Sequence, residues 1–165
     1  MHIPKHFALS ELIPPQLFNQ RNGDPILWLV LDERLLITLD RLRERYGRMI
    51  INNWRAGGVR RESGLREMSS TTGAPLSQHR FGRAADVLFM AVGNGDAHSP
   101  EIVREDMRSL GLFDRDMRHS NDPRLRPFKY INRVEWYANG VPITWFHFDI
   151  GNQRNANGGI RIVNV

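Results

Sequence analysis

Two segments far apart in the chain alternate apolar and polar side chains in the way that half-buried strands do. In residues 145–150 every second position is aromatic or aliphatic, and the positions between carry His147 and Asp149. In residues 84–89 the same alternation places Asp86 between small and apolar neighbours. Because successive side chains of a strand point to opposite faces, each strand offers one face to a core and the other to a site. A buried carboxylate without a partner is costly, so Asp86 needs a metal ion or an arginine beside it.

Three other stretches predict helices. A short helix begins near Ser10 and ends at the prolines 14–15. The strongest signal is an amphipathic helix of about twenty residues over 24–46, which starts at an Asp-Pro pair and ends at Gly47. A third helix starts at a Ser-Pro-Glu sequence and spans 99–110.

The remaining segments complete a small sheet. The predicted strands are residues 49–54, 84–89, 129–137, 143–150 and 160–163. Asn139-Gly140 is a strong signal for the turn of a hairpin between the third and fourth of these. Turns or loops are expected at residues 56–76, 93–96, 114–127 and 152–159. The fold class is therefore α+β: one domain over residues 1–165, with a small, mainly antiparallel sheet and helices packed on one face.

Composition limits the kinds of site and partner. The chain has no cysteine, so any metal must be bound by His, Asp or Glu. No apolar run is long enough to span a bilayer, and the first residues lack the apolar core of an export signal. The net charge is +5, carried largely by arginine, which fits either a solvated basic surface or attraction to an anionic cell wall or nucleic acid. No aromatic-interleaved basic motif supports nucleic-acid binding, which stays a minor hypothesis.

His79, Asp86 and His147 together suggest a zinc site. Two histidines and one carboxylate, with the fourth position open to water, form the ligand set of hydrolytic zinc, whereas structural zinc is usually bound by four protein ligands. The alternatives are histidines that only form hydrogen bonds and an Asp86 that pairs with an arginine.

The motif Ser77-x-His79-x-x-Gly82-x-Ala84-x-Asp86, followed by Trp145-x-His147-x-Asp149, closely resembles the zinc D-Ala-D-Ala carboxypeptidase family. That family includes phage endolysins and shares its fold with the hedgehog signalling domain. The opening Phe7-x-Leu9-Ser10-Glu11 and the aromatic-Arg pair Trp54-Arg55 are similar as well. The resemblance covers nearly the whole chain and implies a hedgehog/DD-peptidase-like fold.

The resemblance also implies roles for individual residues. His79, Asp86 and His147 would bind zinc, and Ser77 would contact the substrate and help to order its loop. Arg55 would meet a substrate carboxylate or the developing oxyanion, because a guanidinium presents fixed donors to such an anion; the alternative is a surface ion pair. Trp145 is expected to contact the substrate.

One position departs from the family pattern. Several members carry the catalytic carboxylate three residues before the last histidine, and Thr144 stands there. Glu135 is the nearest replacement, because a two-residue turn at 139–140 would pair it with Thr144. A bulge or a three-residue loop near residues 140–142 would turn Glu135 toward the face of His147 but would also move it further away. The alternative is a surface strand residue paired with Arg133 or Lys129.

The resemblance predicts a zinc metallopeptidase of phage or bacterial origin that hydrolyses peptidoglycan stem peptides, of the D-Ala-D-Ala carboxypeptidase or L-Ala-D-Glu endopeptidase type. We expect a monomer with no membrane span, located in the host cytoplasm before lysis or in the virion, and acting at the cell wall. The main rival is a virion or scaffold protein that retains the peptidase fold and zinc for stability without catalysis.

Overall fold

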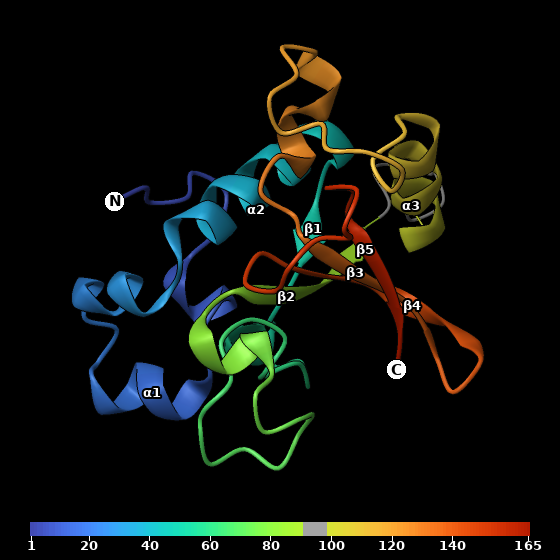
Figure 1. Ribbon diagram of the computed structural model, residues 1–165. Coiled ribbons are helices and arrows are strands. Elements are labelled where there is room, and N and C mark those ends of the chain that lie inside the picture. Colours follow the sequence, from blue (N-terminus) through green and yellow to red (C-terminus); the bar gives the residue numbers. More distant parts are fainter. Residues whose placement is uncertain (91–98) are drawn as a thin grey trace.

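The computed structural model describes residues 1–90 and 99–165 and has an α+β architecture around one five-stranded sheet (Figure 1). The strands are β1 (Met49–Ile50), β2 (Ala84–Phe89), β3 (Arg133–Ala138), β4 (Val141–Asp149) and β5 (Arg161–Asn164). Their order across the sheet is β1-β2-β4-β3-β5. Neighbouring strands are antiparallel except for the β3–β5 pair, which is parallel. The α+β class is confirmed, and the sheet is mixed, with mainly antiparallel pairs.

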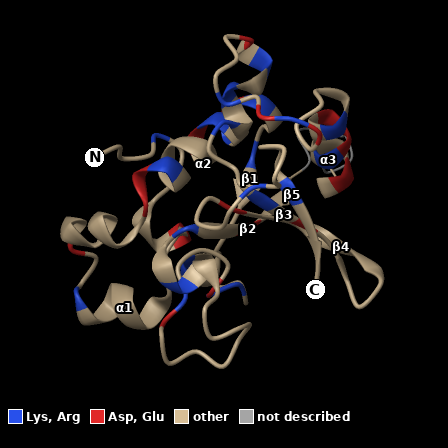
Figure 2. Ribbon diagram, in the orientation of Figure 1, with Lys and Arg blue, Asp and Glu red and all other residues tan. Residues whose placement is uncertain are grey.

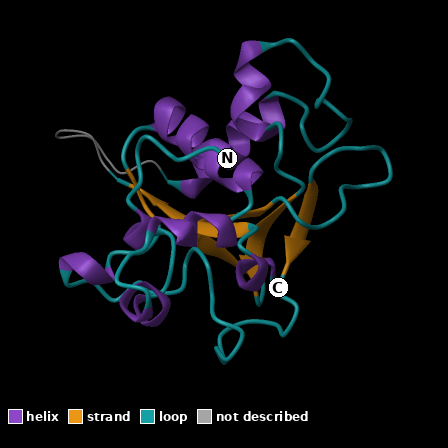
Figure 3. Cartoon of the chain, turned by 90° about the vertical axis from the view of Figure 1, so that its left-hand side faces the viewer, coloured by secondary structure: helices purple, strands orange, loops and turns teal. Residues whose placement is uncertain are grey.

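The helices are α1 (Pro15–Gln20), α2 (Glu33–Tyr46) and α3 (Pro100–Ser109), with short 3-10 helices at Leu9–Glu11, Pro25–Val30, Trp54–Ala56, Gln78–Phe81 and Pro123–Phe128. Figure 3 shows the sheet in the middle of the molecule with helical segments around it. No helix among the described residues combines the length and the apolar character that crossing a bilayer requires.

The core lies between α2 and one face of the sheet. Phe146 and Phe148 of β4 and Val87 of β2 are fully buried on this face. The ring of Tyr46, at the end of α2, contacts Phe89 at 5.6 Å between centroids. The alternation expected for both strands is therefore confirmed, and the opposite face is left for polar side chains.

The long helix expected over residues 24–46 is divided into two. Pro25–Val30 forms a 3-10 helix, Leu31 is extended, and α2 then begins with the Asp32 carboxylate accepting a hydrogen bond from the amide of Arg34. The break allows the amide of Asp32 to donate to the carbonyl of Gly82 at 3.0 Å. Helical periodicity alone could not reveal this long-range contact.

Three further expectations needed correction. The prolines at 14–15 were expected to end a helix, but Pro15 begins α1. At this first helical position its missing N–H costs no hydrogen bond. The strand expected over 49–54 is only two residues long, because the amide of Asn52 donates to the carbonyl of Glu11 instead of to the sheet. The loop expected over 114–127 contains the start of the 3-10 helix Pro123–Phe128, capped by Asp122.

The hairpin and the third helix are confirmed. Asn139 and Gly140 form a two-residue turn with positive φ at both positions, as the primed hairpin turns require. Ser99 caps α3, which ends one residue before Leu110. The turn expected at residues 93–96 lies outside the described residues.

Candidate metal centre

Three short elements bring His79, Asp86 and His147 together. His79 lies in the 3-10 helix Gln78–Phe81, which ends at Gly82 in the left-handed conformation (φ 65°). A side chain at Gly82 would place its Cβ 2.2 Å from the carbonyl oxygen of Val30, so glycine is needed for this close approach. The chain then enters β2, where Asp86 pairs directly with His147 of β4. The predicted convergence of these three residues is thus present in the structure.

The three ligand atoms form a small triangle. The separations are 3.3 Å from His79 Nε2 to His147 Nδ1, 3.5 Å from His79 Nε2 to Asp86 Oδ1, and 2.7 Å from His147 Nδ1 to Asp86 Oδ1. Ligands about 2.05 Å from a tetrahedral zinc lie about 3.3 Å apart. Two edges match this value, and the third is a hydrogen bond that has to lengthen by about 0.6 Å. The donor set and its spacing therefore suit a divalent metal ion.

His79 is held in the tautomer that metal binding requires. Its Nδ1 lies 2.7 Å from the carbonyl oxygen of Gly64, so Nδ1 carries the proton and donates, and Nε2 is free for a metal. Gly64 itself cannot carry a side chain, because a Cβ would lie 2.2 Å from the carbonyl oxygen of Leu12. The amide of Leu65 donates to that same carbonyl at 2.7 Å.

The cluster is electrostatically coupled. Burial raises the pKa of the Asp86 carboxyl, but His79 and His147 outweigh burial and hold this pKa well below its usual range. Burial lowers the pKa of His147, but the hydrogen bond to Asp86 and the charges of Asp86 and Glu135 outweigh it and raise this pKa. The site therefore favours a positive charge between the Asp86 carboxylate and the two histidines. Without a metal ion, a proton bound to His147 supplies this charge.

The cluster forms part of the wall of a cavity of about 530 Å³. Its lining includes the predicted site residues Ser77, Glu135 and Trp145 together with the three candidate ligands. Asp86 and Glu135 are the two acidic side chains among the described residues that line it. Asp86 belongs to the three-residue cluster, and Glu135 is the second acidic side chain of the lining.

The position of Glu135 corrects the expected register. Glu135 pairs with His147 and not with Thr144, because the β3–β4 pairing shifts between Glu135 and Tyr137. Glu135 Oε1 lies 3.5 Å from His147 Nε2, a buried nitrogen with no hydrogen-bond partner among the described residues. The bulge therefore brings the carboxylate next to the cluster, where the opposite was expected. The alternative pairing with Arg133 is also present, at 3.5 Å.

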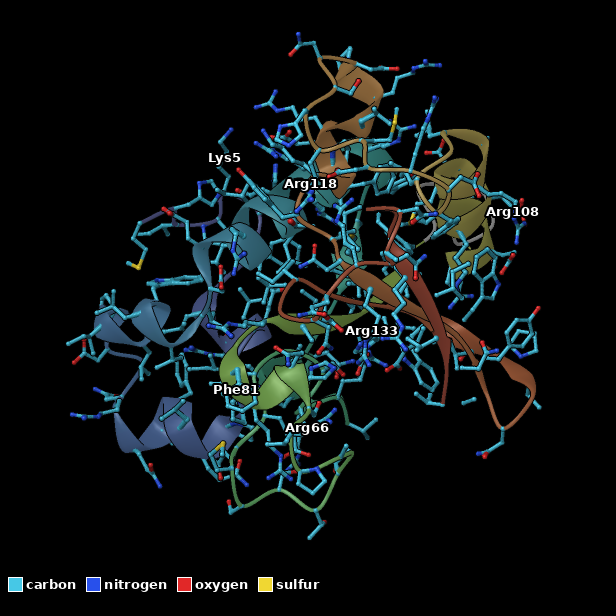
Figure 4. The ribbon with its side chains drawn as sticks, in the orientation of Figure 1. Lys5, Arg66, Phe81, Arg108, Arg118 and Arg133 are labelled. Carbon is cyan, nitrogen blue, oxygen red and sulfur yellow. The ribbon has the colours of Figure 1, made fainter. Side chains whose placement is uncertain are left out.

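Arg55 is not brought to the cluster. Its guanidinium lies over the ring of Phe18 at 5.1 Å, and Arg55 is absent from the described lining of the cavity. Arg66 and Arg133, both labelled in Figure 4, line it instead. Arg66 lies 3.9 Å from Asp86 Oδ2, is 8% exposed, and donates to the carbonyls of Glu62 and Thr72.

Arg66 belongs to a segment whose importance the sequence did not reveal. In residues 63–66 the carbonyl of Ser63 accepts from the amide of Asp86 at 2.7 Å, and the amide of Arg66 donates to the carbonyl of His79 at 3.1 Å. These backbone contacts tie the long irregular loop to both metal-ligand segments. Arg66 is one of three arginines in that loop, and only its position in the fold, close to Asp86 and His79, distinguishes it from the other two.

A second cavity of about 430 Å³ adjoins the first and shares Arg66, Thr72 and Asp86 with it. Its wall also contains Arg60 and Arg61. The Arg60 guanidinium donates to the carbonyls of Ile51 and Asp86, so it is fixed in place. The two cavities thus offer the candidate metal-ligand cluster on one side and an arginine-rich wall on the other.

Comparison of the chain with models of known protein families, with curated proteins and with solved structures found no match. The interpretation of the site therefore depends on its geometry and on the motif resemblance.

Proposed function

We propose that this chain is a zinc-dependent peptidase that hydrolyses peptidoglycan stem peptides, with a hedgehog/DD-peptidase-like fold. The observation that carries the proposal is the convergence of His79 Nε2, Asp86 Oδ1 and His147 Nδ1 beside a cavity in which Glu135 is the remaining carboxylate. A metal with two histidines, one carboxylate and an open position is the arrangement of hydrolytic zinc.

The chemistry is divided among the side chains of the cavity. His79, Asp86 and His147 would hold the ion, and a bound zinc would polarise the scissile carbonyl and lower the pKa of a water molecule. Glu135 accepts the proton of the attacking water and returns it to the leaving amine. The imidazoles of His79 and His147 are buried, which limits the competition of bulk water with these two groups, and Asp86 is 17% exposed toward the cavity.

Glu135 has a second possible role, as the partner of the His147 Nε2–H group. Carboxylates often orient metal-binding histidines in this way. The Glu135→Gln variant separates the two roles, because a glutamine oxygen still accepts from Nε2–H but cannot act as a base. We expect the variant to bind zinc as the unmodified protein does and to lose activity by about 100-fold or more.

The arginines favour an anionic peptide as substrate. Arg66 and Arg133 line the main cavity, and Arg60 and Arg61 extend the positive wall into the second cavity. Figure 2 marks Lys and Arg positions in blue along the ribbon, including positions in and beside β3. Stem peptides carry free carboxylates, which guanidinium groups bind through paired, charge-assisted hydrogen bonds. Arg66 is the residue we assign to the substrate carboxylate or the developing oxyanion, in place of Arg55.

The rival function, a zinc-stabilised virion or scaffold protein without catalysis, has no need of a proton-accepting carboxylate in the cavity. The Glu135 side chain is 15% exposed and lies beside His147, whereas a surface strand residue would face solvent. This placement supports the enzyme.

The experiment combines metal analysis with hydrolysis of purified muropeptides. We expect about one zinc per chain, and zinc-dependent release of D-Ala or cleavage of a stem-peptide bond that is abolished by His147→Ala and by chelation. Full activity after chelation would refute the proposal. Bound iron instead of zinc would also refute it, because two histidines and a carboxylate form the ligand set of iron(II) oxygenases as well.

A further inference from the structure

The β3–β4 hairpin contains an irregularity that places Glu135. Near the turn, Tyr137 pairs with Pro142, but the next pair along the strands is Glu135 with His147. Residues 143–145 of β4 consequently have no ladder partner in β2 or β3 among the described residues. A turn of two residues followed by regular pairing would have set Glu135 opposite Thr144. Some other interaction must therefore hold the shifted register.

The side chain of Arg104, from α3, reaches into this irregularity. Its guanidinium donates to the carbonyl oxygens of Ile143 at 3.3 Å, Trp145 at 2.8 Å and Glu135 at 3.2 Å. Two of these carbonyls belong to the unpaired stretch, and the third belongs to Glu135 itself. Buried carbonyls need donors, and Arg104 supplies those that the interrupted ladder does not.

Arg104 is enclosed by the structure that it supports. It is 1% exposed, and its guanidinium lies over the ring of Trp136, the β3 residue at the shift, at 5.8 Å. Glu101 Oε2 accepts from Arg104 Nη1 at 3.4 Å and from Trp136 Nε1 at 3.2 Å. A buried arginine with a carboxylate partner and three backbone acceptors is locked in one orientation.

We propose that Arg104 is a positioning residue: by filling the β3–β4 irregularity it fixes the register that holds the Glu135 carboxylate beside His147. This inference rests on the proposed function for its catalytic consequence. The metal ligands do not depend on it in the same way, because Asp86 and His147 are aligned by the regular β2–β4 pairing. Loss of Arg104 should therefore displace the carboxylate and leave the metal ligands together.

The first test reads the register directly and needs no activity. In the unmodified protein, NMR should show a cross-strand nuclear Overhauser effect between the backbones of Glu135 and His147. In Arg104→Met we expect this signal to be lost or replaced by one between Glu135 and Thr144. The matched control is Arg108→Met, which removes a second α3 arginine over Trp136 that is exposed and paired with Glu105 (Figure 4). An unchanged Glu135–His147 signal in Arg104→Met would overturn the proposal.

The second test uses kinetics. We expect Arg104→Met to lower kcat by about 100-fold with KM and zinc content little changed, because a small displacement of a catalytic group has an effect of that size. In a Glu135→Gln background the same substitution should cause no further loss, because both changes remove one function. A full additional loss in that background, or an equal loss in Arg108→Met, would contradict positioning through Glu135.

A third variant covers the case in which Arg104→Met does not fold. Arg104→Lys keeps the positive charge, but its ammonium group cannot span three carbonyls. We expect it to fold, to weaken the Glu135–His147 signal and to lower kcat less than Arg104→Met. Unchanged signal and kcat in Arg104→Lys would count against the proposal. If the unmodified protein hydrolyses no muropeptide, the proposed function fails, whereas the NMR result still decides whether Arg104 sets the register.

Discussion

Replacing Asp86 by asparagine tests the metal centre with almost no change in shape. The substitution removes the charged oxygen that lies 2.7 Å from His147 Nδ1 and 3.5 Å from His79 Nε2. With free zinc at 100 times its Kd, the unmodified protein should gain about 2.7 kcal/mol of stability. For a chain of this size that gain raises Tm by about 5–11 °C relative to the metal-free protein.

The variant should respond much less. Loss of an outer partner of a metal ligand lowers affinity by about 10–100-fold, so loss of the ligand itself should lower it by at least about 100-fold. At the same zinc concentration the site is then at most half filled, and the gain falls to about 0.4 kcal/mol, or less than about 2 °C in Tm.

The assay is thermal unfolding by near-ultraviolet circular dichroism, with chelator and with zinc, each variant being compared with its own metal-free form. Glu44→Gln is the matched control, since it removes an exposed carboxylate on α2 away from the cluster. An equal zinc-dependent rise in Tm for Asp86→Asn and the unmodified protein would refute the reasoning, because zinc would then bind elsewhere.

Three further outcomes follow from the same geometry. Because the pKa of His147 is raised and zinc must displace its proton, zinc affinity should fall by about tenfold for each pH unit below that pKa, as measured by competition with a chelating dye. Gly82→Ala should lower the free energy of unfolding by about 1 kcal/mol or more, measured with urea, because its Cβ would lie 2.2 Å from the Val30 carbonyl at a positive φ. Arg66→Ala should reduce kcat/KM on muropeptides by about 100-fold, as loss of an oxyanion donor does, whereas Arg55→Ala should leave it unchanged. A large loss of kcat/KM in Arg55→Ala and none in Arg66→Ala would show that Arg55, and not Arg66, binds the substrate.

The sequence predicted the elements that local signals define. Alternation at residues 84–89 and 145–150 predicted both central strands, and the spacing around His79 and Asp86 indicated a shared site with His147. The turn residues Asn139-Gly140 predicted the hairpin. The strand and turn signals act within a few residues, which is the range over which backbone preferences operate, whereas the grouping of His147 with the other two residues depended on the motif resemblance.

The parts that could not be predicted all depend on contacts between distant segments. The helix break at Leu31 reflects a hydrogen bond from Asp32 to Gly82, about fifty positions later in the chain. The register of Glu135 depends on the buried Arg104 of α3, and no residue in or next to the hairpin sequence indicates that contact. The Trp54-Arg55 pair drew attention to Arg55, and no motif marked Arg66; the fold places Arg66 beside Asp86 and Arg55 over Phe18.

The carbonyl of Leu12 links the amino-terminal segment to the chemistry of the cluster. It receives the amide of Leu65 and lies where a side chain of Gly64 would have to go, so it sets the position of the carbonyl that orients His79. The amino-terminal segment that ends at Leu12 therefore supports the orientation of the His79 ring, although the two lie far apart in the sequence. A change that loosens this contact, such as a deletion or a bulky fusion there, should let the ring turn and weaken the proposed metal binding, although it alters none of the three candidate ligands.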